Sequence, residues 1–403
     1  MVRRPNVGVI GAGMMGKIAV PVIRFAGGNV TAVLGVDGKE VDALAEATRL
    51  GDDAYRGDFG EFDRLLKDDS TDAFYLATPN CFHAEQGIAA ASHGKHPFFE
   101  KPLATTPEDA DRVFDALMQA RVAGDINALY RNYVMFGYMA DTIRTGRLGK
   151  PVKVVMRYLQ DWQMNPEQDI GWRPINEIAG KGKLTGDLGA HVIHNTRYLF
   201  PNAEFVEFEG ERRNVHPVRY KLKKGGAETF GGKTIPSHLE APELYDAMNM
   251  LDDSIYSGDD RASADFVLRL SDDTKVVGYY ELDQVSAGNR NNYTVELVFE
   301  EGTVSWAQET PNWVVEAGKD GKPTNIELGG APGITGRPPG HPKGYTEAMT
   351  IGVQRFLEEI ERAGYGSLTP ENWDAYTGRN IGDAREAVRI IAKWNASSLI
   401  PRV

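Results

Sequence analysis

The chain contains 403 residues, of which 41% are hydrophobic and 25% charged, and its formal net charge is −12. This length predicts two domains. The negative charge argues against DNA, RNA or an anionic membrane as the main partner, because each requires a basic surface. A single cysteine, Cys81, excludes an internal disulfide, and no apolar run approaches the ~20 residues that span a bilayer. Because the N-terminus also lacks the apolar core of a signal peptide, we expect a cytoplasmic protein.

The first third of the chain alternates strand-like and helix-like patterns. Strands are predicted over 6–13, 29–36, 71–79, 95–102 and 125–132, and helices over 16–26, 39–50, 58–68, 81–94 and 107–124. Strands that alternate with helices form βαβ units and hence a parallel sheet. We therefore expect an α/β domain over residues 1–130, a doubly wound Rossmann sheet that binds NAD(P).

After about residue 130 the pattern changes to strands joined by short turns. Strands are predicted over 150–162, 203–213, 264–286, 291–309 and 312–318, with hairpin turns at "SDDT" and "EEGT". The stretches 174–186 and 221–258 are interpreted as loops, and two helices, 344–364 and 379–399, close the chain. We expect residues 131–403 to form an α+β domain with an open, mostly antiparallel sheet, for substrate binding and oligomerisation.

A glycine-rich turn follows the first predicted strand. Gly11, Gly13 and Gly16 form a G-x-G-x-x-G pattern that also contains Met14 and Met15. Such glycines allow a tight turn and close approach of the backbone to a pyrophosphate, and the helix N-terminus that follows attracts its charge. The pattern therefore predicts a dinucleotide site.

The residue that would bind the adenosine ribose is ambiguous. An acid about 20 residues further on performs this role in NAD-binding folds, and Asp37 lies close to that place, although Gly35 occupies it by strand count. Asp37 is equally compatible with a turn before Gly38. No arginine beside Asp37 would bind a 2′-phosphate, so NAD is favoured and NADP stays possible.

Four residues follow the strand predicted over 71–79. Thr78, Pro79 and Asn80 leave this strand, and His83 lies in the first turn of the next helix. Ligands of such sheets bind beyond the carboxyl ends of the strands, so we expect these residues to face the cofactor. Asn80 is also an ordinary helix N-cap residue.

The stretch "FFEKPL" places Glu100, Lys101 and Pro102 directly after a buried strand, where an unpaired charge is costly. Together with the preceding residues, this stretch resembles the glucose–fructose oxidoreductase/inositol dehydrogenase/MocA family, and "GRLGKPVKV" and "GDLGAHVIH" follow in family order. The resemblance implies that Lys101 contacts the substrate hydroxyl beside the nicotinamide, that Glu100 lies near the cofactor, and that the Lys101–Pro102 bond is cis, which a proline permits.

The second motif is "GDLGAHVIH". Asp187 and His191 are four residues apart on a predicted helix, so both project from one face, which His194 shares. Imidazole titrates near pH ~6.5, so His191 can accept the proton that an alcohol loses on oxidation. Asp187 can orient its neighbours and Lys101 can stabilise the developing alkoxide; which of His191 and Lys101 is the immediate base stays open. A metal site is not expected, because no further Cys or His cluster completes a coordination shell.

The resemblance implies further contacts. Trp162, Trp172 and Arg173 correspond to residues that line the nicotinamide or substrate pocket, although each also suits core packing. Arg131, which follows Tyr130, is a candidate for substrate binding. The family often has asparagine at the position that Leu129 occupies in this chain, and this difference leaves the role of Arg131 open. The stretches 341–345 and 289–291 are weaker candidates for substrate contact.

Taken together, these motifs predict an NAD-dependent dehydrogenase that oxidises a secondary hydroxyl of a sugar, inositol or related polyol. Two alternatives stay open: a family member that uses bound NAD for redox-assisted glycoside cleavage, and a non-catalytic NAD(P)-binding sensor. The presence of Lys101, Asp187 and His191 together counts against the sensor. The open sheet implies, by the same resemblance, a homodimer or homotetramer.

Overall fold

A computed structural model describes residues 3–165, 172–173, 176–216, 229–230, 233–234, 258–327, 344–397 and 399–401. The chain forms two compact units. The N-terminal unit comprises residues 1–127, 225–238 and 349–389, and the sheet unit comprises residues 128–224, 239–348 and 390–403. Each unit is described by itself below.

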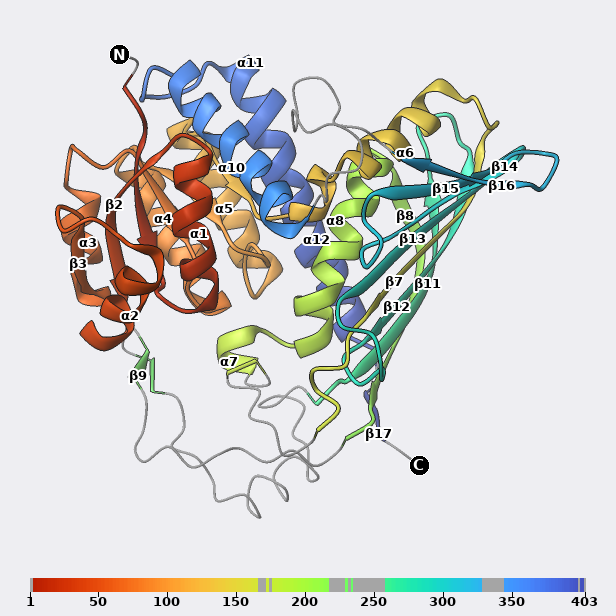
Figure 1. The fold of residues 1–403 in the computed structure, drawn as a ribbon, viewed down its shortest axis with the longest axis horizontal. Coiled ribbons are helices and arrows are strands. Elements are labelled where there is room, and N and C mark those ends of the chain that lie inside the picture. Colours follow the sequence, from red (N-terminus) through yellow and green to blue (C-terminus); the bar gives the residue numbers. More distant parts are fainter. Residues whose placement is uncertain are drawn as a thin grey trace. The chain divides into compact units, whose positions relative to one another are not determined.

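The N-terminal unit contains a six-stranded parallel sheet in the order β3-β2-β1-β4-β5-β6, as predicted for a doubly wound fold (Figure 1). Its strands are β1 (Asn6–Ile10), β2 (Asn29–Gly35), β3 (Tyr55–Asp58), β4 (Ala73–Leu76), β5 (His96–Phe99) and β6 (Asp125–Ile126). The connecting helices are α1 (Met14–Phe25), α2 (Gly38–Thr48), α3 (Phe62–Leu66), α4 (His83–Ser92) and α5 (Pro107–Ala120). Strands β1 and β4 are almost completely buried, which explains their continuous apolar sequences.

Helices from the end of the chain also belong to this unit. They are most of α10 (Tyr345–Arg362), α11 (Pro370–Trp373) and the first part of α12 (Arg379–Asn395). The ring of Phe356 packs on Phe98 with centroids 5.3 Å apart, and Gly124 N donates to Thr377 Oγ1 at 3.0 Å. The predicted division at residue 130 thus lies close to the observed change at 127/128, but 349–389 falls in the N-terminal unit, not in a domain 131–403.

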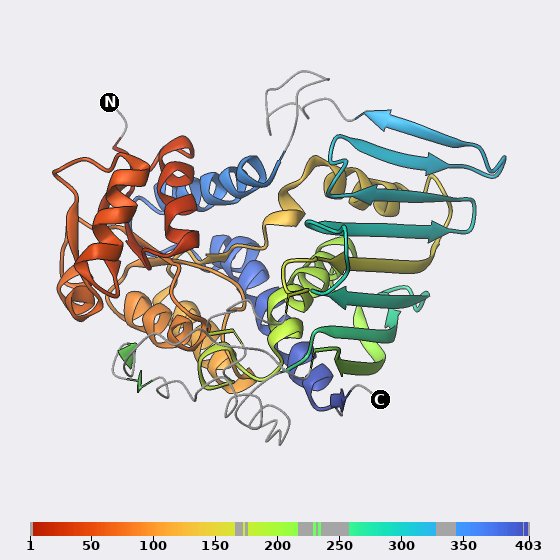
Figure 2. The ribbon, with the colours of Figure 1, turned by 60° about the horizontal axis from the view of Figure 1, so that its bottom comes forward.

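The sheet unit contains a nine-stranded, mostly antiparallel sheet in the order β16-β15-β14-β13-β7-β12-β11-β8-β17 (Figure 2). Its strands are β7 (Pro151–Leu159), β8 (Glu204–Asn214), β11 (Arg261–Arg269), β12 (Lys275–Asp283), β13 (Asn292–Phe299), β14 (Gly302–Ala307), β15 (Trp313–Ala317), β16 (Pro323–Glu327) and β17 (Leu399–Pro401). Both predicted hairpins are confirmed, because β11 pairs with β12 and β13 pairs with β14. A separate antiparallel pair, β9 (Thr229–Phe230) and β10 (Lys233–Thr234), belongs to the N-terminal unit.

One face of the large sheet is covered by helices α6 (Val134–Thr145) and α8 (Ala190–Leu199) (Figure 1). Helix α8 is attached to this face by Asn195, which donates to Tyr293 OH at 2.9 Å, and by Thr196, whose hydroxyl lies 2.6 Å from Tyr280 OH. The segment 174–186, interpreted from sequence as a loop, contains helix α7 (Asn176–Ala179), and a π-helical turn (Thr185–Gly189) leads into α8. This turn carries Asp187.

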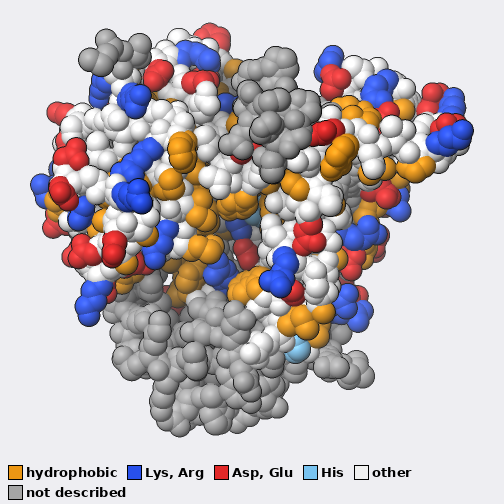
Figure 3. Space-filling view, in the orientation of Figure 1, with side chains coloured by type: hydrophobic (Ala, Val, Ile, Leu, Met, Phe, Trp, Pro, Cys, Tyr) orange, Lys and Arg blue, Asp and Glu red, His pale blue; other side chains and the backbone are white. Residues whose placement is uncertain are grey.

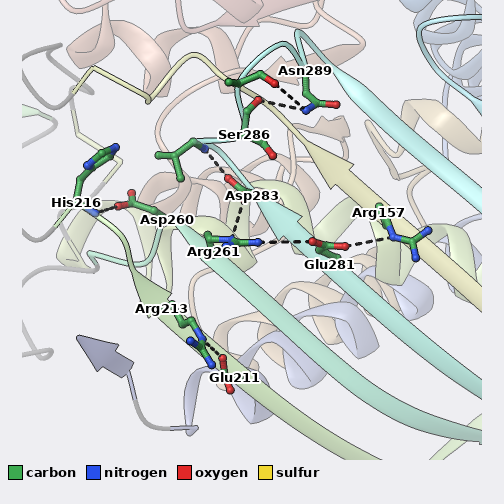
Figure 4. A network of polar contacts seen from close by, with 12 residues as sticks. Arg157, Glu211, Arg213, His216, Asp260, Arg261, Glu281, Asp283, Ser286 and Asn289 are labelled. Carbon is green, nitrogen blue, oxygen red and sulfur yellow. Dashed lines mark hydrogen bonds and ion pairs between the residues drawn. The ribbon is translucent and has the colours of Figure 1, made fainter. Parts of the chain in front are cut away.

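The opposite face of the sheet carries charged side chains in cross-strand pairs (Figure 4). Arg157 on β7 faces Glu281 on β12 with 3.2 Å between Nε and Oε2, and Arg261 on β11 lies 2.8 Å from Asp283. Strand β12 alternates between buried and more exposed residues, so one face packs against helices and the other is polar. Among the described residues of this unit, no helix covers the polar face (Figure 1).

Candidate active site

The glycine turn has the geometry of a dinucleotide cradle. Gly11 has φ +117°, and a Cβ there would lie 2.4 Å from Ala77 O. A Cβ at Gly16 would lie 2.0 Å from Gly11 O, so only glycine fits at either position. Helix α1 begins at Met14, and its N-cap residue, Gly13, supplies no capping side chain. The N–H groups of the first helical turn therefore suit a pyrophosphate, as predicted.

Asp37 serves as the N-cap of helix α2. Its Oδ1 accepts a hydrogen bond from Glu40 N at 2.9 Å, and its backbone is extended, as is usual at this position. Asp37 therefore has the turn role considered from the sequence, and its contact with the ribose stays a prediction.

The end of strand β4 is tied to the segment that carries Lys101. His83 is completely buried, and its Nδ1 and Nε2 lie 2.7 Å from Pro102 O and 2.9 Å from Thr78 O. Burial lowers the pKa of His83, and the charge of Lys101 acts in the same direction. A neutral imidazole has one N–H group, so His83 donates to one of these carbonyls and packs against the other, which places its ring between two loops.

The other residues after β4 are arranged around this connection. Thr78 is buried and donates its hydroxyl to Gln86 at 2.6 Å. Pro79 precedes a short 3-10 turn that begins at Asn80. Thr78, Pro79 and Asn80 therefore lie just beyond the carboxyl end of β4, where a cofactor is expected.

Glu100 follows strand β5 as a buried carboxylate with two donors. Tyr75 OH and Asn127 Nδ2 donate to its Oε1 at 2.5 and 2.8 Å. Burial raises the pKa of Glu100, while these hydrogen bonds and the charge of Lys101 oppose the rise. The Lys101–Pro102 bond is cis, as the resemblance implied. These hydrogen bonds therefore fix the carboxylate of Glu100, the residue directly before Lys101.

In the sheet unit, Asp187 has two polar neighbours that come from distant parts of the sequence. Gln284 Nε2 donates to Asp187 Oδ2 at 2.9 Å, and Arg173 Nε lies 3.9 Å from the same oxygen. Gln284 is completely buried, whereas the side chains of Asp187 and Arg173 are 22% and 33% exposed. The carboxylate of Asp187 is therefore fixed by the buried Gln284 and remains partly exposed to solvent.

His191 lies on a cluster of tyrosines. Its ring packs edge-on against Tyr130 with centroids 5.0 Å apart, and Tyr158 lies at 5.8 Å. The two tyrosine hydroxyls are 2.7 Å apart, and Tyr158 OH donates to Asn291 Oδ1 at 2.8 Å. Burial raises the pKa of Tyr130 to about 12, and the negative charge of Asp187 adds to the rise. The tyrosines therefore stay neutral and connect His191 with the surroundings of Asp187.

The predicted aromatic residues form a second group around Arg173. The guanidinium carbon of Arg173 lies 5.7 Å from the ring of Trp162 and 5.3 Å from that of Trp172. Trp162 Nε1 donates to Gln160 Oε1 at 2.8 Å, and Gln160 donates in turn to Asn291. The structure thus brings together four predicted site residues of the sheet unit, namely Trp162, Trp172, Arg173 and Asp187.

Of the remaining predicted residues, some belong to the described chain and others lie outside it. Arg131 occupies a 3-10 turn (Leu129–Asn132) and is half-buried. In the predicted loop 289–291, Asn291 belongs to the tyrosine network, whereas Asn289 donates to Ser286 O. Residues 341–343 of the other predicted loop lie outside the described residues.

Sequence reasoning missed several residues of these networks. Gln284 and Tyr158 lie in strand-like sequence with no motif, and Tyr75 and Asn127 are ordinary residues near strand ends. The only available signal was the alternation of β7, which places Tyr158 on the covered face.

Two family models match the chain. One, described as an oxidoreductase family with an NAD-binding Rossmann fold, matches residues 5–124, and the other, described as the GFO/IDH/MocA C-terminal domain, matches residues 136–305. The glycine turn and these matches define an oxidoreductase-family protein with an NAD-binding domain. The chain belongs to the GFO/IDH/MocA family, which confirms the resemblance.

Curated relatives match part of the chain. Levoglucosan dehydrogenase of Pseudarthrobacter phenanthrenivorans is 32% identical over 232 residues, which cover 56% of this chain and 58% of the relative. 1,5-Anhydro-D-fructose reductase of Ensifer adhaerens is 31% identical over 193 residues, 48% of this chain and 55% of the relative. The matches thus span little more than half of these relatives.

The fold matches solved structures over almost its full length. A levoglucosan dehydrogenase in complex with NADH and levoglucosan has a TM-score of 0.76 and 22% identity, with 98% of this chain and 97% of that chain covered. This similarity supports the fold.

The candidate site residues belong to both units. Lys101, Glu100 and the glycine turn are in the N-terminal unit, and Asp187 and His191 are in the sheet unit. Among the described residues, no group of three or more His, Cys, Asp or Glu side chains could hold a metal ion. No helix in the described part of the chain is long and apolar enough to cross a membrane.

Proposed function

We propose that this protein is an NAD-dependent dehydrogenase that oxidises a secondary hydroxyl of a sugar, inositol or related polyol. The observation that carries the proposal is the cluster in the sheet unit. There, a partly exposed Asp187 is fixed by Gln284 beside Arg173, and His191 is supported by neutral tyrosines. The names of the relatives, a levoglucosan dehydrogenase and an anhydrofructose reductase, support the same substrate class.

The chemistry requires the alcohol to lose a hydride from carbon and a proton from oxygen. Bound NAD⁺ supplies the hydride acceptor. In the proposed reaction Lys101 donates a hydrogen bond to the substrate oxygen and stabilises its developing negative charge. His191 or Lys101 accepts the proton, and Asp187, held by Gln284, orients the reacting hydroxyl.

The remaining side chains of the cluster suit a neutral polyol. Trp162 and Trp172 offer apolar ring faces to the C–H groups of a sugar, and Gln160 and Asn291 hold the Trp162 ring in place through their hydrogen bonds. Arg173 lies between the tryptophan rings and Asp187, so its charge is already balanced by the carboxylate. An uncharged substrate therefore fits this cluster better than a sugar phosphate.

The decisive experiment is the substitution Lys101→Met. We expect NADH formation, followed by its absorbance against a panel of sugars and inositols, to disappear, while NADH binding followed by fluorescence persists. Lys67→Met, which changes an exposed lysine of the same unit, serves as the control and should retain full activity. Full turnover by the Lys101→Met variant would refute the proposal.

The same panel separates the two alternatives. An enzyme that cleaves glycosides through transient oxidation would release product without net NADH. A sensor would bind NADH and one of the sugars but form no product, and the presence of Lys101, Asp187 and His191 argues against it.

We further propose that the protein is a cytoplasmic homodimer or homotetramer that associates through the polar face of the large sheet. Val277 and Trp313 on this sheet are 49% and 43% exposed, which suits a surface that a second copy covers. The substitution Val277→Lys should then shift the molar mass, measured by light scattering, toward that of the monomer. An unchanged mass would place any interface elsewhere.

A further inference from the structure

The carboxylate of Glu40 occupies an unusual place for a helix residue. It lies in the first turn of α2, half-buried, and its Oε2 accepts a hydrogen bond from Val36 N at 3.0 Å. Asp37 accepts in turn from Glu40 N, so the two acids form a reciprocal cap at the start of this helix. The cap directs the Glu40 side chain back toward the end of strand β2.

Two glycines define where this carboxylate lies. A Cβ at Gly35, the last residue of β2, would lie 3.0 Å from Glu40 Oε2. A Cβ at Gly13, the second glycine of the dinucleotide turn, would have one neighbour within 4 Å, Glu40 Oε1 at 3.8 Å. The carboxylate is therefore located between the glycine turn and the carboxyl end of the second strand.

This is the place where an acid binds the adenosine ribose in dinucleotide-binding folds. The residue expected there by strand count is Gly35, which has no side chain, and Asp37 is engaged as the helix cap. We propose that Glu40 binds the ribose hydroxyls of NAD and thereby selects NAD over NADP. The inference depends on the dinucleotide-binding role of the glycine turn and not on the proposed dehydrogenase activity, so the two can fail separately.

The chemistry of the carboxylate supports this selection. The Val36 N–H group holds one oxygen and so fixes the orientation of the carboxylate, while Oε1 faces the glycine turn. Ribose hydroxyls can donate to such an oxygen, whereas a 2′-phosphate would bring a second negative charge against it. Lys39 is the adjacent cation in the sequence, but neighbouring residues of a helix do not share a face.

The alternative is that Glu40 does nothing beyond capping the helix, and one pair of variants distinguishes the two roles. Glu40→Gln keeps an oxygen for Val36 N–H but removes the charge. Asp37→Asn is the matched control, because asparagine caps helices as well as aspartate does. We would titrate the full-length wild type and both variants with NADH and with NADPH, follow binding by fluorescence, and record the melting temperature of each.

We expect the wild type to bind NADH more tightly than NADPH. In Glu40→Gln the Kd for NADH should rise about tenfold, as for the loss of a hydrogen bond to a charged group, and the NADH/NADPH preference should fall at least as much. Asp37→Asn should leave this ratio unchanged. A ratio within twofold of wild type in Glu40→Gln, or an equal change in Asp37→Asn, would overturn the proposal. These are binding measurements, so they are interpretable even if no sugar is oxidised.

Discussion

Lys183 is a buried cation four residues before Asp187, and replacing it tests whether the geometry around Asp187 depends on it. Its Nζ lies 2.9 Å from Asp260 Oδ1 and donates to Gln163 Oε1 at 2.7 Å. The side chains of Lys183 and Asp260 are only 1% and 0% exposed. Lys183 precedes Asp187 by four residues and Gln163 follows Trp162, so this cluster anchors both segments of the candidate site.

The substitution Lys183→Met leaves Asp260 as a buried charge without its cation. Breaking a buried pair on one side typically costs about 3–5 kcal/mol. Asp260 keeps its hydrogen bond from His216 N at 2.9 Å, and methionine fills most of the space of the lysine stem, so we expect about 3 kcal/mol. The matched control is Lys150→Met: the side chains of Lys150 and its partner Asp272 are 60% and 56% exposed, so the loss of this pair should have a much smaller effect.

The assay is urea unfolding of the wild type and both variants at pH 7, with the midpoint and slope of the transition as readouts. The double variant Lys183→Met/Asp260→Asn should recover part of the lost free energy of unfolding, because it also removes the buried negative charge that Lys183 balances. The folded fraction of Lys183→Met should also show a raised KM, since the Asp187 and Trp162 segments lose their anchor. Equal, small losses in Lys183→Met and Lys150→Met would refute the reasoning.

Three further predictions concern the site and its surroundings. Gln284→Leu removes the donor to Asp187, so kcat should fall about tenfold or more, measured by NADH absorbance, while the Kd for NADH stays constant. His191→Asn should lower kcat by about 10²–10⁴-fold, again with NADH affinity unchanged; unaltered turnover would exclude a role in proton transfer. Burial and the charge of Lys95 lower the pKa of His96 to about 4, so the folded state stays neutral while the unfolded state binds a proton below pH 6.5. Stability should therefore fall as the pH drops from about 6.5 toward 4, by up to about 3 kcal/mol, and urea midpoints should show a smaller drop in His96→Asn.

The parts of the fold that the sequence predicted are those that depend on local pattern. Glycines at fixed spacing after an apolar run produce the β1–α1 turn, because a side chain at Gly11 or Gly16 would collide with backbone atoms. Alternation along β11 and β12 predicts a hairpin with one covered face. By contrast, the grouping of residues 349–389 with the N-terminal unit depends on contacts such as Phe98 with Phe356, which no local pattern reveals.

The candidate site shows the same limit at the level of single residues. Asp187 and His191 could be proposed from their spacing, but the donor to Asp187, Gln284, is 97 residues away and has no motif. His83 was expected beside the cofactor because of its position after a strand. Its two ring nitrogens lie against the carbonyl oxygens of Thr78 and Pro102, and position alone does not indicate which atoms a side chain will meet.

The two units hold their site residues by separate means, and this has a consequence for the reaction. The N-terminal unit fixes the segment around Lys101 through Glu100 and its donors Tyr75 and Asn127. The sheet unit fixes Asp187 through Gln284. On the face shown in Figure 3, acidic and basic side chains are interspersed over the N-terminal unit. The hydrogen bonds of Glu100 and of Asp187 described above each join residues of one unit, so we expect the substitution Gln284→Leu to alter substrate binding and turnover without altering NADH affinity.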